Sequence, residues 1–149
     1  MRRINAFSLI ELLVVVVLVG ILAVMALPNF TRGAERARIR DAEAVLAAIH
    51  SAERVYYLDQ NGYGRVAPLA PLDPTQDDLI RLGYLSNPDA GDTNKDWNFA
   101  AVLTGGGSGF NGTATRTGVS MWNGNTIFIN QNFNGENYVC TGYDAALCP

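Results

Sequence analysis

The stretch Phe7–Leu27, which reads FSLIELLVVVVLVGILAVMAL, decides how this chain must be organised. Its only polar side chains are Ser8 and Glu11. As an α-helix with a rise of about 1.5 Å per residue it would be about 32 Å long, close to a hydrocarbon core of about 30 Å. The run Val14–Val17 would form a poor helix in water, but a lone span in lipid can satisfy its backbone groups only as a helix. The segment is therefore predicted to span a membrane.

The residues that flank this segment predict its orientation. Arg2 and Arg3 lie on its short N-terminal side, so the positive-inside rule predicts a cytoplasmic N-terminus with the rest of the chain outside. Three general interpretations compete for the segment: a secretory signal peptide cut after Ala26, an export signal that depends on the arginine pair, and an uncut anchor. None of them explains Glu11.

Glu11 is the most informative residue of the sequence. A carboxylate within an apolar span costs about 2.5–3.5 kcal/mol on insertion scales, so such a residue usually has a partner. A cut between Ala6 and Phe7 would create an α-amine one helical turn from Glu11. The two opposite charges could then pair within one chain or between neighbouring helices of a bundle.

The run Ala6–Val15, AFSLIELLVV, resembles the prepilin processing signature of type IV pilins and of the related pseudopilins of type II secretion. That signature combines a short basic leader, a cut before Phe, an acid at the fifth mature residue and an apolar run. Gly20 and Pro28 also occupy positions where such proteins commonly carry these residues. The residue before the cut is usually Gly, and Ala6 is its nearest substitute in size.

The resemblance, close over about the first 30 residues and loose to residue 60, implies a life history. Residues 1–6 would be a leader, and cleavage would leave an N-methylated Phe7. The precursor would cross the inner membrane once, and the mature chain would join an extracellular pilus. The implied partners are identical subunits, a prepilin peptidase and the pilus assembly machinery, and the residues implied in assembly are Glu11, Gly20 and Pro28.

The residues that follow are predicted to continue the helix. Residues 7–28 would form the transmembrane and assembly half, and residues 29–60 an amphipathic half, with Pro28 either kinking the rod or ending the span. Apolar residues at spacings of three and four predict a stripe that needs a sheet as partner: Ile39, Ala42, Leu46, Ile49, Ala52 and Tyr56, widened by Val45, Ala48 and Val55.

A linker region is predicted over residues 61–98. The sequence Asn61-Gly62-Tyr63-Gly64 tolerates positive φ angles and should end the long helix. Within the linker, Asp77–Leu85 is predicted to form one short helix that stops at Gly83.

Residues 99–149 are predicted to form a small antiparallel sheet, which makes the fold class α+β. The expected strands are Phe99–Thr104, Gly118–Trp122, Thr126–Asn130 and Tyr138–Thr141. Asn123-Gly124 is a hairpin signal between two of them. The glycine-rich stretch Gly105–Gly109 is interpreted as a flexible loop, because it lacks the Lys-Ser/Thr of a phosphate-binding loop.

Cys140 and Cys148 are the two cysteines of the chain. At this spacing they can close a small loop, and a chain exported from the cytoplasm meets conditions in which a disulfide persists. A pair of free thiols is the alternative.

One oxygen-rich cluster is a weak calcium candidate: Asp89, Asp92, Asn94 and Asp96. Its spacing matches the first half of a calcium loop, but Trp97 and Leu103 stand where an EF-hand needs Gly and Glu. The family resemblance adds that major pseudopilins hold calcium in this region, whereas a plain polar turn is the alternative. No other cofactor is expected.

No group of residues predicts catalysis, and the chain is not expected to be an enzyme. His50 is the single histidine and is interpreted as a solvated or half-buried helix residue. Without Arg2 and Arg3 the remaining chain has 9 basic and 14 acidic residues, so nucleic acid is not an expected partner. The local basic patch of Arg32, Arg36, Arg38 and Arg40 is interpreted as a contact with lipid headgroups.

The predicted function is that of a structural pilin subunit. A pseudopilin and, in a different class, a membrane-anchored extracytoplasmic binding module are the alternatives. The cysteine pair favours a pilus, because pilins often close a loop there. The Asp89–Asp96 cluster favours a pseudopilus. Adhesion, twitching motility, DNA uptake and electron transfer remain open as roles of the filament.

Overall fold

The computed structural model describes residues 8–64, 78–87, 96–144 and 146–148. Within the long helix, the side chains of residues 25–29 are outside this description. The chain forms two compact units, residues 1–36 and residues 37–149. Each unit is described by itself below.

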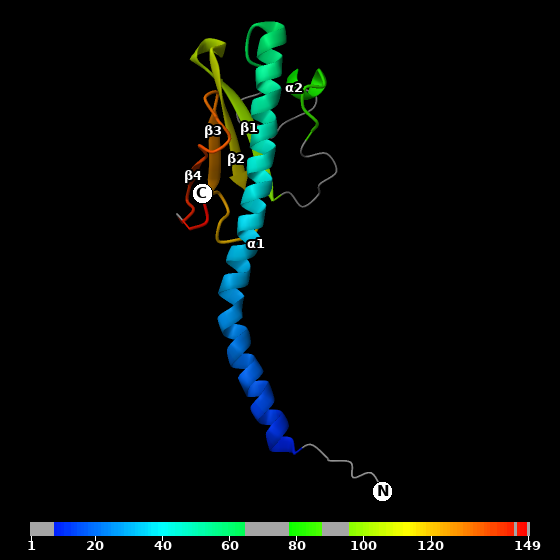
Figure 1. The fold of residues 1–149 in the computed structure, drawn as a ribbon, viewed down its shortest axis with the longest axis vertical. Helices are drawn as coiled ribbons and strands as arrows, with labels where there is room; N and C mark the ends of the chain where they lie inside the picture. The colour runs from blue at the N-terminus through cyan, green and yellow to red at the C-terminus, as the bar shows by residue number, and fades with distance from the viewer. Residues whose placement is uncertain (1–7, 65–77, 88–95, 145, 149) are drawn as a thin grey trace. The chain divides into compact units, whose positions relative to one another are not determined.

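The helix α1 runs from Leu9 to Gln60 and continues through Pro28 (Figure 1). It ends as predicted, because Asn61 adopts a positive φ of 55° and cannot continue a right-handed helix. Asn61 N–H still donates to the carbonyl of Tyr57 at 2.9 Å.

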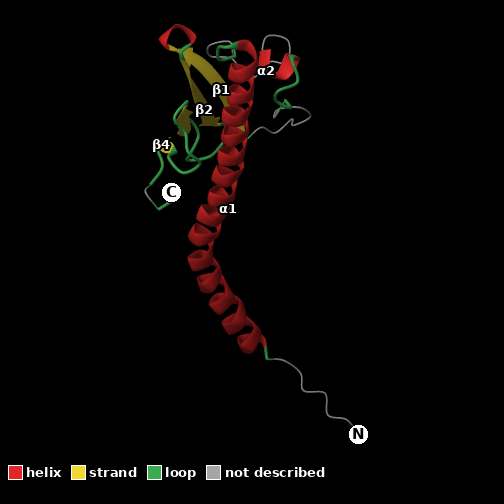
Figure 2. Cartoon of the chain, turned by 45° about the horizontal axis from the view of Figure 1, so that its top comes forward, coloured by secondary structure: helices red, strands yellow, loops and turns green. Residues whose placement is uncertain are grey.

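Four antiparallel strands form the sheet, in the order β1-β2-β3-β4. The strands are β1 (Trp97–Thr104), β2 (Gly109–Arg116), β3 (Thr126–Asn130) and β4 (Val139–Thr141). Figure 2 shows the sheet in yellow beside the C-terminal part of α1. The predicted α+β class, with a long helix packed on a small antiparallel sheet, is therefore confirmed.

The second strand was not predicted from the sequence. The prediction paired residues 118–122 with β3, but β2 is the partner, with Asn111 opposite Asn130 and Thr115 opposite Thr126. Residues 118–122 form turns instead. The Asn123-Gly124 signal lies in the connection between β2 and β3, where Gly124 has a φ of 86° and donates to the carbonyl of Arg116 at 2.9 Å.

The connection between β1 and β2 also differs from the prediction. Residues Gly105–Gly109 were predicted to form a flexible loop, whereas Gly105–Gly107 form the short 3₁₀ helix η1 and Gly109 begins β2. The helix η1 joins β1 and β2, which pair from Trp97 opposite Arg116 to Thr104 opposite Gly109. These glycines therefore form the turn of a β-hairpin.

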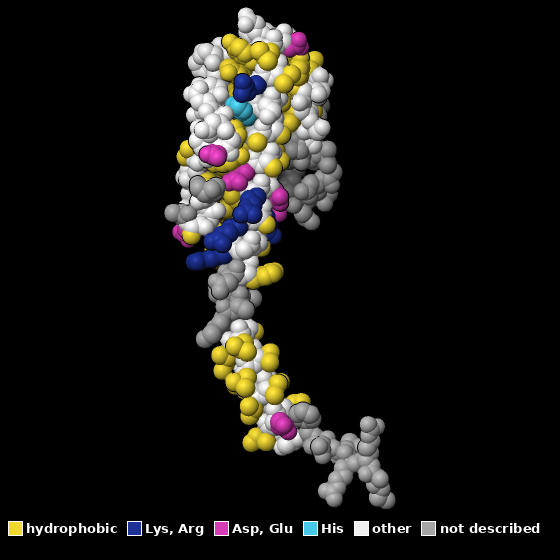
Figure 3. All heavy atoms as spheres, viewed as in Figure 1, with side chains coloured by type: hydrophobic (Ala, Val, Ile, Leu, Met, Phe, Trp, Pro, Cys, Tyr) yellow, Lys and Arg dark blue, Asp and Glu magenta, His cyan; other side chains and the backbone are white. Residues whose placement is uncertain are grey.

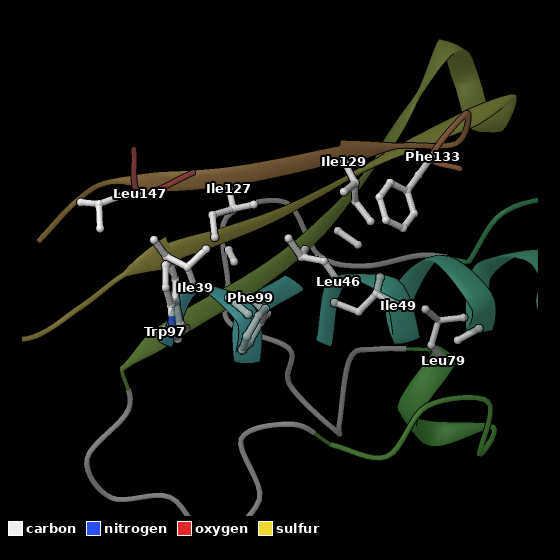
Figure 4. Packing of buried hydrophobic residues seen from close by; sticks show 14 residues of the cluster. Ile39, Leu46, Ile49, Leu79, Trp97, Phe99, Ile127, Ile129, Phe133 and Leu147 are labelled. Carbon is white, nitrogen blue, oxygen red and sulfur yellow. The ribbon is translucent and has the colours of Figure 1, made fainter. Parts of the chain in front are cut away.

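The core lies between the C-terminal half of α1 and one face of the sheet. Ile39, Leu46 and Ile49 point from the helix toward Phe99, Ile127 and Ile129 of the sheet (Figure 4). The predicted stripe is buried from Ile39 to Ala52, and Tyr56 is partly buried. Of the residues expected to widen it, Val45 is half-buried, whereas Ala48 and Val55 are exposed.

Gly112 of β2 leaves room for the side chain of Ile129, its partner on β3. A Cβ atom at this position would lie 2.9 Å from Ile129 Cγ1 and 3.5 Å from Leu46 Cδ2. The first distance is too short for a real carbon–carbon contact, so a larger residue here would require the Ile129 side chain to move.

The short helix α2 spans Asp78–Arg81, and Leu79 is its buried residue. It is shorter than the predicted Asp77–Leu85. Gly83 has a φ of 81°, and the N–H groups of Tyr84 and Leu85 turn back to the carbonyl of Leu79 at 2.8 and 3.0 Å. These reversed hydrogen bonds end the helix early.

Candidate functional site: an apolar helix with a carboxylate in its first turn

Glu11 lies in the first turn of α1. Its backbone N–H donates to the carbonyl of Ser8 at 3.1 Å, and Leu12 N–H donates to the same oxygen at 3.2 Å. An acid in a first turn is favoured by the partial positive charge of the helix N-terminus. Ala6 and Phe7, the predicted cleavage site, lie outside the described residues, so the proximity of the Phe7 amine to Glu11 stays a prediction.

The apolar side chains that follow Glu11 are exposed around the helix. The exposed fractions of the large ones up to Val24 lie between 49% at Val14 and 70% at Val24. Figure 3 shows this part of the unit covered with yellow hydrophobic side chains. A helix that is apolar on every side needs an apolar environment, either lipid or other helices.

The other two predicted assembly residues lie in the same helix. Gly20 has open space around it, since a Cβ atom there would meet nothing within 4 Å. Pro28 lies within α1, and its side chain is outside the described residues. Among the described residues, no helix is both long and apolar enough to cross a membrane. The described side chains of this region end at Val24 and resume at Phe30.

The predicted disulfide is present between Cys140 of β4 and Cys148, with 6.3 Å between their Cα atoms. Leu147, inside the loop that the disulfide closes, is buried in the core. The side chain of Asn125 also donates to the carbonyl of Gly142 at 2.9 Å. The loop is thus fixed to the sheet by a covalent bond, a hydrogen bond and apolar packing.

Asp96 is the only member of the calcium candidate within the described residues. One of its carboxylate oxygens accepts from Arg38 Nε at 3.0 Å, and the other accepts from Arg116 Nη1 at 2.8 Å. Both oxygens therefore already have a cationic partner. Asp89, Asp92 and Asn94 lie outside the described residues, and the calcium site stays a prediction.

Arg116 is a buried cation that the sequence analysis missed. It is only 4% exposed, and its Nη1 also donates to the carbonyls of Asp96 at 2.7 Å and Thr117 at 2.8 Å. Its guanidinium lies 5.7 Å from the ring centre of Trp97. It ends an alternating polar and small-residue strand, so nothing in the local pattern distinguishes it from an exposed arginine.

His50 is buried, contrary to the prediction of a solvated or half-buried residue. Its Nε2 donates to the carbonyl of Gln131 at 3.3 Å. Its ring lies 5.7 Å from Phe110 and 5.3 Å from Phe133. Among the described residues, no group of three or more His, Cys, Asp or Glu side chains could hold a metal ion.

Glu43 and Tyr138 are two ionisable residues that lie close together in the unit of residues 37–149, which is called the head below. Burial raises the pKa of Glu43, although the nearby Arg40 partly opposes this change. Burial and the charge of Glu43 raise the pKa of Tyr138, whose hydroxyl donates to the Glu43 carbonyl at 3.3 Å. Elsewhere, the hydrogen bond that Tyr84 donates to Asp59 raises the pKa of Tyr84.

Comparison with known proteins finds similarity in the N-terminal part of the chain. Residues 1–27 match the family described as the prokaryotic N-terminal methylation motif. This match includes the predicted cleavage site, Glu11 and the apolar run, and the chain is similar to proteins of two kinds.

These similar proteins are type IV pilins and core proteins G of type II secretion systems. The chain is 33% identical over 90 residues to the type IV major pilin protein PilA of Myxococcus xanthus, which covers 60% of this chain and 40% of that protein. It is 39% identical over 62 residues to the type II secretion system core protein G of Aeromonas hydrophila, covering 42% and 43%. It is 33% identical over 88 residues to the type IV wide pilus major component PilA4 of Thermus thermophilus, covering 59% and 60%.

The chain thus spans between 40% and 60% of the lengths of these three relatives. None of the three names denotes an enzyme. No solved structure matches the chain significantly.

Proposed function

We propose that this chain is a structural subunit of a type IV pilus. The observation that carries the proposal is the combination of the methylation motif over residues 1–27 with a helix whose apolar side chains are exposed on every side. Such a surface needs a cover, and polymerisation supplies one by packing the helices of many subunits together. Before assembly, the inner membrane would supply the same cover.

In this proposal each part of the chain has a distinct task. A prepilin peptidase removes residues 1–6, and Phe7 becomes the N-methylated first residue. Glu11 then pairs with a Phe7 amine while the apolar helices pack. The head displays the sheet and the disulfide loop on the outside of an extracellular filament.

Electron microscopy of filaments sheared from the producing cell, with mass spectrometry of their protein, tests this proposal. The expected result is this chain as a main component of the filaments. A cell surface that carries filaments without this chain would contradict it.

A pseudopilin of type II secretion is the second candidate. It is favoured by the similarity to core protein G of Aeromonas hydrophila and by the acidic cluster from Asp89 to Asp96. Deletion of the gene separates the two functions. A pilin mutant should lose surface filaments and still secrete its exoproteins, whereas a pseudopilin mutant should retain exoproteins inside the cell.

A further inference from the structure

A cavity of about 470 Å³ opens on the head between the last turns of α1 and the segment that follows β3. This volume falls within the range of about 300–1,000 Å³ that is typical of sites for small molecules. The described residues that line it are His50, Arg54, Tyr57, Leu58, Tyr63, Gln131, Asn132 and Phe133.

The electrostatic character of this cavity is opposite to that of the head. Residues 37–149 hold seven basic and 12 acidic residues, so the head is acidic. The described lining nevertheless contains the guanidinium of Arg54 and no carboxylate. Among the described residues, Arg54 forms no ion pair, and its side chain is exposed. In Figure 3 the histidine, coloured cyan, lies directly beside a dark-blue basic side chain on this face. The cavity therefore favours an anion.

Aromatic rings form one wall of the cavity. Tyr57 and Tyr63 lie 4.8 Å apart between ring centres, and Tyr63 continues to Phe110 at 5.3 Å. Because Arg54, Tyr57 and Leu58 are three and four residues apart on α1, they share one helix face. A ligand held by the guanidinium would thus lie against a phenol ring.

The opposite wall provides neutral polar groups. Gln131 and Asn132 carry side-chain amides that can donate and accept hydrogen bonds. His50 is held in one tautomer, because its Nε2–H donates to the carbonyl of Gln131 and leaves Nδ1 as an acceptor. These groups suit a ligand with several hydroxyls.

We propose that this cavity binds a sugar acid, a monosaccharide-sized ring that carries a carboxylate. The guanidinium of Arg54 binds the carboxylate, the ring stacks on Tyr57 and Tyr63, and the amides of Gln131 and Asn132 bind the hydroxyls. The site lies wholly within one head, so it does not depend on the proposed filament. It can be tested in the detergent-solubilised full chain, where failure of the filament proposal does not affect the result.

Calorimetric titration of the full chain with glucuronate, glucose and inorganic phosphate tests the proposal. Glucuronate should bind more tightly than glucose and phosphate. Arg54→Gln should weaken glucuronate binding about tenfold or more, because it removes a charge-assisted hydrogen bond. Arg40→Gln removes the same charge from the same helix outside the cavity and should leave binding unchanged.

A second variant separates ring recognition from anion recognition. Tyr57→Leu should weaken binding of glucuronate severalfold. The melting temperature of this variant should stay close to that of the parent, because Tyr57 is 41% exposed. Three results would overturn the proposal: no binding of glucuronate, equal affinity for phosphate and glucuronate, or the same loss in Arg40→Gln as in Arg54→Gln.

Discussion

At the scale of single residues, Glu11 separates insertion from assembly. Glu11→Gln keeps the size of the side chain but removes the charge that a span must bury. Membrane insertion should be unchanged or improved, because a buried charge costs about 2.5–3.5 kcal/mol. Assembly should fail, because the Phe7 amine loses its partner. Immunoblots of membrane and sheared-filament fractions measure both, with the exposed Glu136→Gln as the matched control. Normal filaments from Glu11→Gln would show that the charge pair is not needed.

Glu43 predicts a dependence of stability on pH. Because burial raises its pKa in the folded state, the folded chain binds this proton more tightly than the unfolded chain does. The stabilisation that comes from this tighter proton binding is therefore complete at pH values below the ordinary glutamate pKa. It is lost as the pH rises through the raised pKa of Glu43 in the folded state. Glu43→Gln removes this loss, so its melting temperature at pH 7 should exceed that of the parent.

Thermal unfolding at pH 4 and pH 7 measures this difference. Asp41→Asn, an exposed carboxylate on the same helix, is the control and should not stabilise the chain at pH 7. A Glu43→Gln variant that is less stable than the parent at pH 7 would show that the carboxylate has a favourable partner.

Arg116 and Asp96 predict that the head does not need calcium for stability. Arg116→Met keeps much of the side-chain volume but leaves the carbonyls of Asp96 and Thr117 without their donor. The unfolding free energy should fall by about 2–3 kcal/mol, because the lost hydrogen bonds involve a charged, buried group.

Addition of EGTA to the parent should leave its melting temperature unchanged, since both Asp96 oxygens are bound by arginines. A large fall in melting temperature with EGTA would instead support the calcium site.

At the scale of elements, the disulfide loop is the clearest contributor to stability. Its closure of a short loop should contribute about 2.5 kcal/mol through lost entropy of the unfolded chain. Replacement of both Cys140 and Cys148 by Ser should lower the melting temperature by roughly 10 °C. Differential scanning calorimetry measures the change, and reductant should lower the parent to the same temperature. If the double variant has the same melting temperature as the oxidised parent, the packing of Leu147 alone holds the loop.

The elements also show how far the sequence predicts this fold. The helix stripe and β3 were predictable, because each has a regular apolar period and a turn residue at its end. The strand β2 was not, because its inward positions are Phe110, Gly112, Ala114 and Arg116. A small residue is required at Gly112 by the close approach of the Ile129 side chain, and that requirement comes from packing and not from local propensity.

The candidate functional residues can likewise be predicted only in part from the sequence. The sequence alone singles out Glu11, because one charge in an apolar run has a high cost regardless of context, and its role in assembly stays a prediction. The cavity beside Arg54 was not, because Tyr57, Tyr63 and Gln131 come together only when the segment after β3 returns to the helix. The burial of His50 depends on the same return.

At the scale of the whole molecule, the match to the N-terminal methylation motif predicts that the mature chain begins at Phe7. Mass spectrometry of the N-terminal peptide should show this start with one added methyl group. Ala6→Gly restores the usual residue before the cut and should be processed at the same bond at least as fast. A mature chain that starts at Met1 or at Leu27 would rule out prepilin processing.

The sheet order also determines when the head can become complete during synthesis of the chain. Each strand pairs with the next along the chain, so the hairpins can form as soon as they emerge. The helix can pack on the sheet only later, because its contacts are with residues far along the chain. His50 is hydrogen-bonded to Gln131, 81 residues away, and Glu43 to Tyr138, 95 residues away. Throughout that interval the stripe from Ile39 to Ala52 has no sheet to cover it. The risk from proteases and aggregation is therefore greatest while the residues beyond β3 are being synthesised, and slowing that last part of synthesis should lower the yield of folded protein most.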